Sequence, residues 1–222
     1  GVLAEGGDPA VSHVGPGFVN SFGESIEMMR QAFLCKKGQP FIVSASGTLG
    51  WDMAASNLLE KGDKALVVNT GYFGDKFGES LEAYDCAVTH LRAPVGDAPS
   101  ISELEAALSK DKFKMVTITH VDTSTGVLVD IPGYAKAIRK CSPDTLIVVD
   151  GVCATGGEET RMDDWDLDYV LTASQKAFGV PPGLCLSVAS ERAMDAFNSR
   201  QSKIPNYYAS WQKWLPIMKA YE

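Results

Sequence analysis

Residues 168–183, DYVLTASQKAFGVPPG, combine an apolar run, a single lysine and a loop with two prolines. The apolar run at residues 169–171 predicts a short buried strand. A single lysine, Lys176, follows this strand and precedes an apolar loop with two prolines. A lysine in that position is expected to be partly desolvated, which favours the neutral amine and makes it available as a nucleophile. Taken alone, the stretch fits an ordinary lysine on a loop tip better, so the rest of the chain has to decide.

Apolar runs that fit strands alternate along the chain with segments of helical periodicity. We expect strands at residues 41–43, 65–69, 86–91, 115–119, 146–150, 169–171 and 184–189. We expect helices at residues 21–35, 48–60, 73–84, 100–108, 131–138 and 190–197, and from residue 207 onward. This alternation predicts an α/β fold in which a parallel or mostly parallel sheet has helices on both faces. Residues 1–222 are expected to form one domain, because no repeat or low-complexity linker interrupts the pattern.

Local signals set the expected ends of several elements. Ser21 with Glu24, and Ser100 with Glu103, each fit a capping box at the start of a helix. Residues 1–20 are rich in glycine and proline, so we expect a loop or arm there. Residues 70–74, TGYFG, are expected to form a turn.

The composition argues against several classes of partner and site. The formal net charge of −8 and the isoelectric point near 4.9 argue against binding to nucleic acid or to an anionic membrane. No apolar run is long enough to span a bilayer. The five cysteines are scattered and include no Cys-x-x-Cys motif. We therefore expect an intracellular protein with reduced thiols and no metal centre, whether in the cytoplasm, a peroxisome or a mitochondrion.

Polar segments follow the predicted strands at the points where the strands end. Sites in folds of this class lie at the carboxyl ends of the strands. The segments expected to converge there are residues 46–48, 70–73, 120–126, 150–153 and 174–176.

Four features within these segments each allow two interpretations. Ser46, Gly47 and Thr48 fit an anion site at the start of a helix, although a simple helix cap looks the same. Asp150 ends the most apolar strand and needs a cationic or N–H partner, which could equally be a helix end or an ion pair. Phe73 could offer a flat face to a ring or belong to the core. Residues 123–125 could donate hydroxyl groups or form a turn.

Taken together, these features match the needs of one kind of ligand. A phosphorylated pyridine cofactor requires an anion cradle, an aromatic face, a carboxylate for its ring nitrogen and a lysine for its aldehyde. The cradle, Phe73, Asp150 and Lys176 supply one of these each.

At this point the sequence resembles the class V family of pyridoxal-phosphate-dependent aminotransferases, in particular its alanine–glyoxylate and serine–glyoxylate branch and the fungal members of that branch. The matching segments are 44–52 (SASGTLGWD), 69–75 (NTGYFGD), 119–126 (THVDTSTG), 148–153 (VVDGVC), 172–177 (TASQKA) and 214–222 (WLPIMKAYE). The resemblance implies the large domain of a fold type I enzyme, with a mostly parallel sheet of the seven-stranded type.

The resemblance also implies a role for each matching residue. Lys176 would bind pyridoxal phosphate covalently, and Asp150 would pair with its ring nitrogen. Phe73 and Val152 would contact the two faces of the ring, and Thr123 would lie near its polar edge. Ser46, Gly47, Thr48 and Gln175 would hold the phosphate.

The activity that the resemblance implies is a ping-pong transamination between alanine or serine and glyoxylate or pyruvate, in a homodimer. Two alternatives stay open. One is a lyase of the cysteine desulfurase type, although those enzymes usually carry a histidine where Gln175 stands. The other is a dimerising module that binds the cofactor without turnover.

The chain departs from the family pattern at both ends. Family members begin with a Gly-Pro segment that contributes to the active site, and this sequence is expected to open downstream of it. The arginine that binds the substrate carboxylate, in a small C-terminal domain, matches none of the arginines here, and two neighbouring-subunit contacts to the phosphate also lie beyond Glu222. The sequence is therefore expected to be an incomplete large cofactor-binding domain, residues 1–222.

Overall fold

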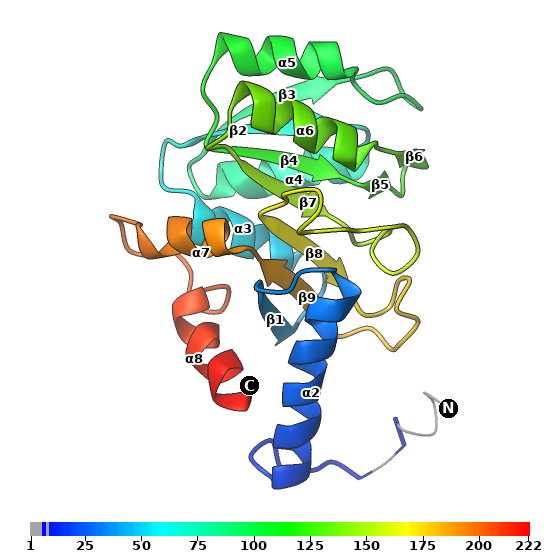
Figure 1. The fold of residues 1–222 in the computed structure, drawn as a ribbon, viewed down its shortest axis with the longest axis vertical. Coiled ribbons are helices and arrows are strands. Elements are labelled where there is room, and N and C mark those ends of the chain that lie inside the picture. Colours follow the sequence, from blue (N-terminus) through cyan, green and yellow to red (C-terminus); the bar gives the residue numbers. More distant parts are fainter. Residues whose placement is uncertain (1–5, 8) are drawn as a thin grey trace.

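A single seven-stranded sheet runs through the molecule in the order β1-β9-β8-β7-β4-β2-β3 (Figure 1). The computed structural model describes residues 6–7 and 9–222. The strands of this sheet are β1 (Gln39–Ser44), β2 (Lys64–Asn69), β3 (Ala87–Arg92), β4 (Met115–Thr119), β7 (Leu146–Asp150), β8 (Tyr169–Ala173) and β9 (Leu184–Ala189). Only β9 runs against the others, because it pairs antiparallel with both β8 and β1. The α/β fold and the mostly parallel sheet are confirmed.

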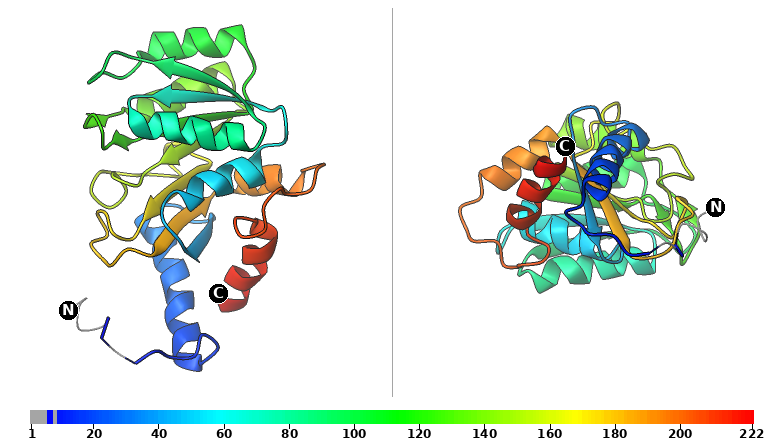
Figure 2. Two further views of the ribbon diagram at one scale, coloured as in Figure 1. Left: turned by 180° about the vertical axis from the view of Figure 1, so that it is seen from behind. Right: turned by 90° about the horizontal axis from the view of Figure 1, so that it is seen from below.

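Helices cover both faces of the sheet. They are α2 (Pro16–Ala32), α3 (Leu49–Leu58), α4 (Tyr72–Ala83), α5 (Ile101–Lys110), α6 (Ile131–Cys141), α7 (Glu191–Asn198) and α8 (Trp211–Tyr221). α5 and α6 pack together on one face, and α3 and α4 lie on the other (Figures 1 and 2). α2 and α8 pack against each other and against β1, at one end of the sheet. Within the described residues, no helix is both long enough and apolar enough to cross a membrane.

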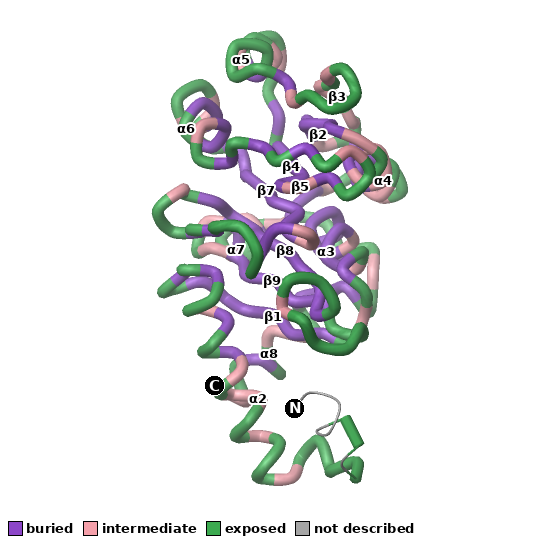
Figure 3. The backbone as a smooth tube through the Cα atoms, turned by 90° about the vertical axis from the view of Figure 1, so that its right-hand side faces the viewer, coloured by how far each residue is buried: buried purple, intermediate pink, exposed green. Residues whose placement is uncertain are grey.

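The core lies along the central strands. Every residue of β4, β7 and β8 is buried, and exposed residues gather on the helices and loops outside them (Figure 3). Strands buried on both faces need the continuous apolar runs that the sequence shows, such as LIVV in β7. This packing makes the sheet a rigid base for the loops at its edges.

The first described helix begins earlier than the sequence predicts. α2 starts at Pro16, with Gly15 as its N-cap, so the expected loop over residues 1–20 is wrong from residue 16 onward. Residues 1–5 and 8 lie outside the described part. Ser21 stands inside the helix, where its carbonyl oxygen accepts a hydrogen bond from the Ser25 hydroxyl at 2.7 Å. The expected capping box at Ser21 is therefore wrong, because proline at the first helical position fixes an earlier start.

Other helix ends follow their local signals. Ser100 and Glu103 form a reciprocal capping box at the start of α5, and the Ser190 hydroxyl accepts the Ala193 N–H at the start of α7. α4 begins at Tyr72, however, so residues 72–74 are helical and only Thr70 and Gly71 connect it to β2. The expected turn over residues 70–74 is wrong for its second half.

Candidate active site

The polar segments predicted to converge lie along one edge of the sheet. The parallel strands β1, β2, β4, β7 and β8 end at this edge, which we call the carboxyl edge. The short hairpin of β5 (Val121–Asp122) and β6 (Val127–Leu128) lies on the same side as the loops that follow β7 and β8 (Figure 1). The contacts between these segments show how closely they meet.

Ser46, Gly47 and Thr48 connect β1 to the start of α3. A Cβ atom at Gly47 would lie only 2.8 Å from Val152 Cγ2 and 3.2 Å from Ala173 Cβ, so only glycine fits between the loop that follows β7 and the end of β8. Among the described residues, the N–H groups of Gly47 and Thr48 have no hydrogen-bond acceptor. The start of α3 therefore offers unpaired N–H donors at the carboxyl edge.

Asp150 is the last residue of β7, and its side chain is buried. Its Oδ1 accepts the Val152 N–H at 2.9 Å, and its Oδ2 accepts the Trp51 indole N–H at 2.8 Å. Burial raises the pKa of Asp150 to about 6, these two hydrogen bonds oppose the rise, the Asp122 charge adds to it and the Lys176 charge lowers it. A buried carboxyl group whose pKa is perturbed in this way is typical of functional sites.

Phe73 occupies the first turn of α4 and is half-buried. Its ring meets the Trp51 indole edge to face, with centroids 6.5 Å apart and planes at 64°. The Phe73 and Gly74 N–H groups donate to Asp122 Oδ2 at 3.2 and 3.4 Å. The buried Asp122 carboxylate therefore caps α4 and fixes Phe73 at the carboxyl edge.

Thr123 lies in the turn between β5 and β6. Its hydroxyl is 2.8 Å from Cys153 Sγ, in the loop after β7. The neighbouring Ser124 hydroxyl accepts the Tyr72 N–H at 2.9 Å, at the start of α4. The hairpin thus joins the Asp150 loop to the helix that carries Phe73.

Lys176 follows β8, as predicted, but it is exposed, as is Gln175. The expectation of a partly desolvated lysine is wrong for this chain, because the lysine lies beyond the end of the strand and the apolar loop does not cover it. The loop itself is held firmly. The buried Ser174 hydroxyl donates to Pro181 O at 2.8 Å and accepts the Leu184 N–H at 3.2 Å. The Gly183 carbonyl accepts the Ala45 N–H at 2.8 Å, which ties the Lys176 loop to the segment before Ser46.

Sequence reasoning missed two residues of this edge, Trp51 and Asp122. Each carried a usable signal. Trp51 lies three positions after Thr48 and so falls within the first turn of the helix that starts at the edge. Asp122 is an acidic residue beside hydroxyl residues, three positions after the end of a buried strand, where a carboxylate needs N–H donors.

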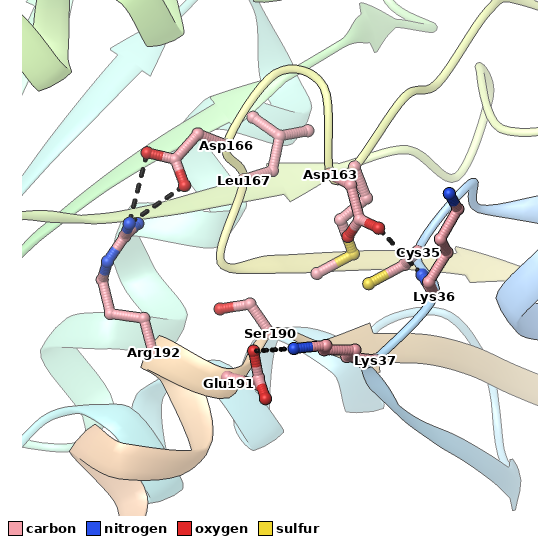
Figure 4. Close-up of a pocket in the computed structure, with 11 residues that line it drawn as sticks. Cys35, Lys36, Lys37, Asp163, Asp166, Leu167, Ser190, Glu191 and Arg192 are labelled. Carbon is pink, nitrogen blue, oxygen red and sulfur yellow. Dashed lines mark hydrogen bonds and ion pairs between the residues drawn. The ribbon is translucent and has the colours of Figure 1, made fainter.

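A hollow of about 360 Å³ lies away from this edge and is lined by Cys35, Lys36, Lys37, Gly38, Met162, Asp163, Asp166, Leu167, Ser190, Glu191 and Arg192 (Figure 4). Its residues precede β1 and β8 or follow the reversed strand β9, which places it at the opposite edge of the sheet. Its charges pair with one another: Arg192 with Asp166 at 2.9 Å, and Lys37 with Glu191 at 3.9 Å. It contains none of the predicted site residues.

Comparison with known proteins identifies the family of the chain. The family model described as aminotransferase class-V matches residues 10–202. Alanine–glyoxylate aminotransferase 1 of Saccharomyces cerevisiae is 42% identical over 96% of this chain and 58% of its own length. L-aspartate–glyoxylate aminotransferase of Paracoccus denitrificans is 32% identical over 85% of this chain and 48% of its own. The chain thus spans about half the length of the curated relatives it matches.

The same relationship appears in three dimensions. The crystal structure of ureidoglycine–glyoxylate aminotransferase from Bacillus subtilis superimposes with a TM-score of 0.92 at 26% identity, over 100% of this chain and 56% of that one. The sheet described above is therefore that of the fold type I aminotransferases. The family model matches residues 10–202, and the Saccharomyces cerevisiae relative is 42% identical over 96% of the chain. The chain therefore belongs to the class-V aminotransferase family.

Proposed function

We propose that the protein to which this chain belongs catalyses a pyridoxal-phosphate-dependent transamination, with alanine or serine as amino donor and glyoxylate or pyruvate as acceptor. The observation that carries the proposal is the arrangement of Asp150, the start of α3 and Lys176 along one edge of the sheet. The glyoxylate aminotransferases among the relatives support the choice of acceptor.

The start of α3 fits the phosphate of such a cofactor. The N–H groups of Gly47 and Thr48, which have no acceptor among the described residues, are donors for an anion, and Gly47 itself is buried against Val152. Ser46 and Thr48 are exposed beside them, so their hydroxyl groups can bind the same anion. Gln175, exposed next to Lys176, is the fourth phosphate ligand that we propose.

Asp150 and Phe73 fit the ring. Asp150 can hold a proton on the ring nitrogen, because each of its oxygens accepts one hydrogen bond and keeps a lone pair for another. Phe73 would pack on one face of the ring, Val152 on the other, and Thr123 would bind the polar edge. When bound, the cofactor supplies an electron sink for the substrate Cα.

Lys176 would hold the cofactor covalently through Nζ. Once released, the same amine is the base that moves the proton at the substrate Cα. Its exposure in this chain is consistent with a group that must reach both cofactor and substrate.

We further propose that residues 1–222 correspond to the large cofactor-binding domain and that the working enzyme is a homodimer. The relatives' greater length supports the first part. The half-reactions would alternate, with the keto acid leaving before the acceptor binds.

Titration of the full-length protein with pyridoxal phosphate, followed by a turnover assay, tests the proposal. We expect a visible absorption band and transfer of the amino group from alanine or serine to glyoxylate. Release of sulfur from cysteine without transamination would instead indicate a desulfurase. An absorption band without turnover of any donor would indicate a binding module.

A further inference from the structure

Trp51 is a buried residue of the first turn of α3, with 7% of its surface exposed. The helix packs tightly on the sheet at this point, because a Cβ atom at Gly50 would lie 2.8 Å from Leu171 Cβ. The indole is held on its faces as well. It stacks on Phe77 with centroids 5.4 Å apart and planes at 17°, and it meets the edge of Phe73. Trp51 therefore has little freedom to choose another rotamer.

The indole N–H points at one atom, Asp150 Oδ2, at 2.8 Å. An indole N–H is a donor only, so it binds the Asp150 oxygen as an acceptor and cannot itself accept a proton from a protonated carboxyl group. The Val152 N–H occupies Oδ1 at 2.9 Å in the same way. Both contacts stabilise the ionised carboxylate over the acid.

The charged and titratable groups around Asp150 come from three other elements. Asp122 of β5 disfavours its ionisation, and Lys176 after β8 favours it. The Cys185 thiol of β9 is nearby as well, since Asp150 contributes to raising the pKa of that thiol to about 12, although burial is the main cause. Without the Trp51 contact, only the Val152 N–H and Lys176 would favour the ionised form of Asp150 against burial and the Asp122 charge.

We propose that Trp51 is a positioning residue that fixes the Asp150 carboxylate in one rotamer and in its ionised form, ready for the protonated ring nitrogen of the cofactor. The inference rests on the proposed function. Trp51 is not one of the residues proposed to contact the cofactor, and it would act on the cofactor only through Asp150. The energy involved is that of a hydrogen bond to a charged group, which corresponds to roughly tenfold or more in an equilibrium constant.

The chain offers a matched pair of substitutions. Trp51→Phe removes the N–H and keeps an aromatic ring against Phe77. Trp211→Phe removes a buried indole N–H that has no partner in the described structure. Trp211 is fully buried and stacks on Phe41 at 4.9 Å, so the control loses comparable packing without losing a hydrogen bond.

The test measures the dissociation constants of two compounds from the cofactor-free, full-length protein. The compounds are pyridoxal 5′-phosphate and its 1-deaza analogue, in which C–H replaces the ring nitrogen. We expect Trp51→Phe to weaken pyridoxal phosphate binding about tenfold and to leave the analogue unchanged or slightly tighter, since only the former needs a charged partner. Trp211→Phe should not change the ratio of the two constants.

Equal weakening of both compounds by Trp51→Phe, or no weakening of either, would overturn the inference and leave Trp51 as a packing residue. If Trp51→Phe does not fold, the double variant with Asp150→Asn decides. Recovery of folding would identify an unpaired carboxylate as the cause and support the inference, whereas continued failure would overturn it. A wild type that binds neither compound would refute the proposed function itself, which is a different result.

Discussion

Asp150 is the residue at which burial, hydrogen bonding and charge meet. Its pKa is raised to about 6, mainly by burial, so the folded state binds its proton more tightly than the unfolded state does. The stabilising contribution of this proton is therefore complete below about pH 4 and is lost as the pH rises through about 6. Asp150→Asn removes the titration while keeping a similar shape.

We predict that the unfolding free energy of the cofactor-free wild type, minus that of Asp150→Asn, falls by roughly 2 kcal/mol between about pH 4 and about pH 7. Denaturant titrations of both proteins across this range measure it. The unfolding free energy of the wild type is compared with that of Asp150→Asn because both proteins contain buried His120, which titrates in the opposite sense and cancels in the difference. Burial lowers its pKa to about 4, so its contribution is lost as the pH falls. A difference that stays constant with pH would show that Asp150 is ionised throughout.

For single residues, the sequence predicts the place of a residue relative to a strand end better than it predicts its exposure and contacts. Lys176 and Asp150 stand at the ends of β8 and β7 as expected, since hydrophobic runs fix where a buried strand stops. The exposure of Lys176 depends on how the loop after β8 folds. The contact between Trp51 and Asp150 depends on how α3 packs against β7, although the two residues lie 99 positions apart in the sequence. No local pattern encodes such a contact.

The helix α4 shows how an element carries a site residue. Its first turn is capped by Asp122, from a hairpin that lies about 50 positions further along the chain. We predict that Asp122→Ala destabilises the protein by about 1–2 kcal/mol through loss of the cap. It should also weaken pyridoxal phosphate binding several-fold, because Phe73 is no longer held at the edge.

Asp130→Ala is the control for this variant. Asp130 caps α6 by accepting the Gly133 N–H at 3.2 Å, but it lies outside the candidate site. Thermal unfolding and cofactor titration of both variants separate the two effects. If Asp130→Ala weakened cofactor binding as much as Asp122→Ala, the cap of α4 would have no special role in the site.

Element boundaries were predictable where a cap or an apolar run was unambiguous, as at Ser100 and in β7. They were not predictable where two signals competed. Pro16 and Ser21 both fit a helix start, and the structure uses Pro16, whose fixed φ suits the first helical position. The stacked pair Phe18 and Phe22, 5.7 Å apart, extends the helix over the extra turn. The reversed direction of β9 could not be predicted either, because a buried strand has the same apolar pattern in both directions.

For the whole molecule, the main question is where the substrate carboxylate binds. All six arginines already donate hydrogen bonds to acceptors within the chain. Arg92 at the end of β3, for example, pairs with Asp75 at 2.6 Å, and Arg139 pairs with the buried Asp168 at 2.6 Å. A bidentate clamp on the substrate would have to break such a pair or come from elsewhere.

We therefore predict that residues 1–222 expressed alone bind pyridoxal phosphate but transaminate alanine or serine at least about a hundredfold more slowly than the full-length protein, since orientation of the substrate is lost. Parallel assays with glyoxylate as acceptor measure this. Comparable rates from both proteins would mean that one of the six arginines leaves its partner to bind substrate, and Arg92→Gln would then identify or exclude the one nearest the carboxyl edge.

The central claim is that this edge of the sheet binds pyridoxal phosphate through Lys176. Reduction of the loaded protein with borohydride, followed by digestion and peptide mapping, tests it most directly, because the reduced linkage stays on the lysine that formed it. We expect the cofactor mass on the peptide that contains Lys176, and none on the Lys176→Ala protein. The same mass on a peptide that contains Lys203 or Lys213, with Lys176 unmodified, would show that the cofactor binds another lysine.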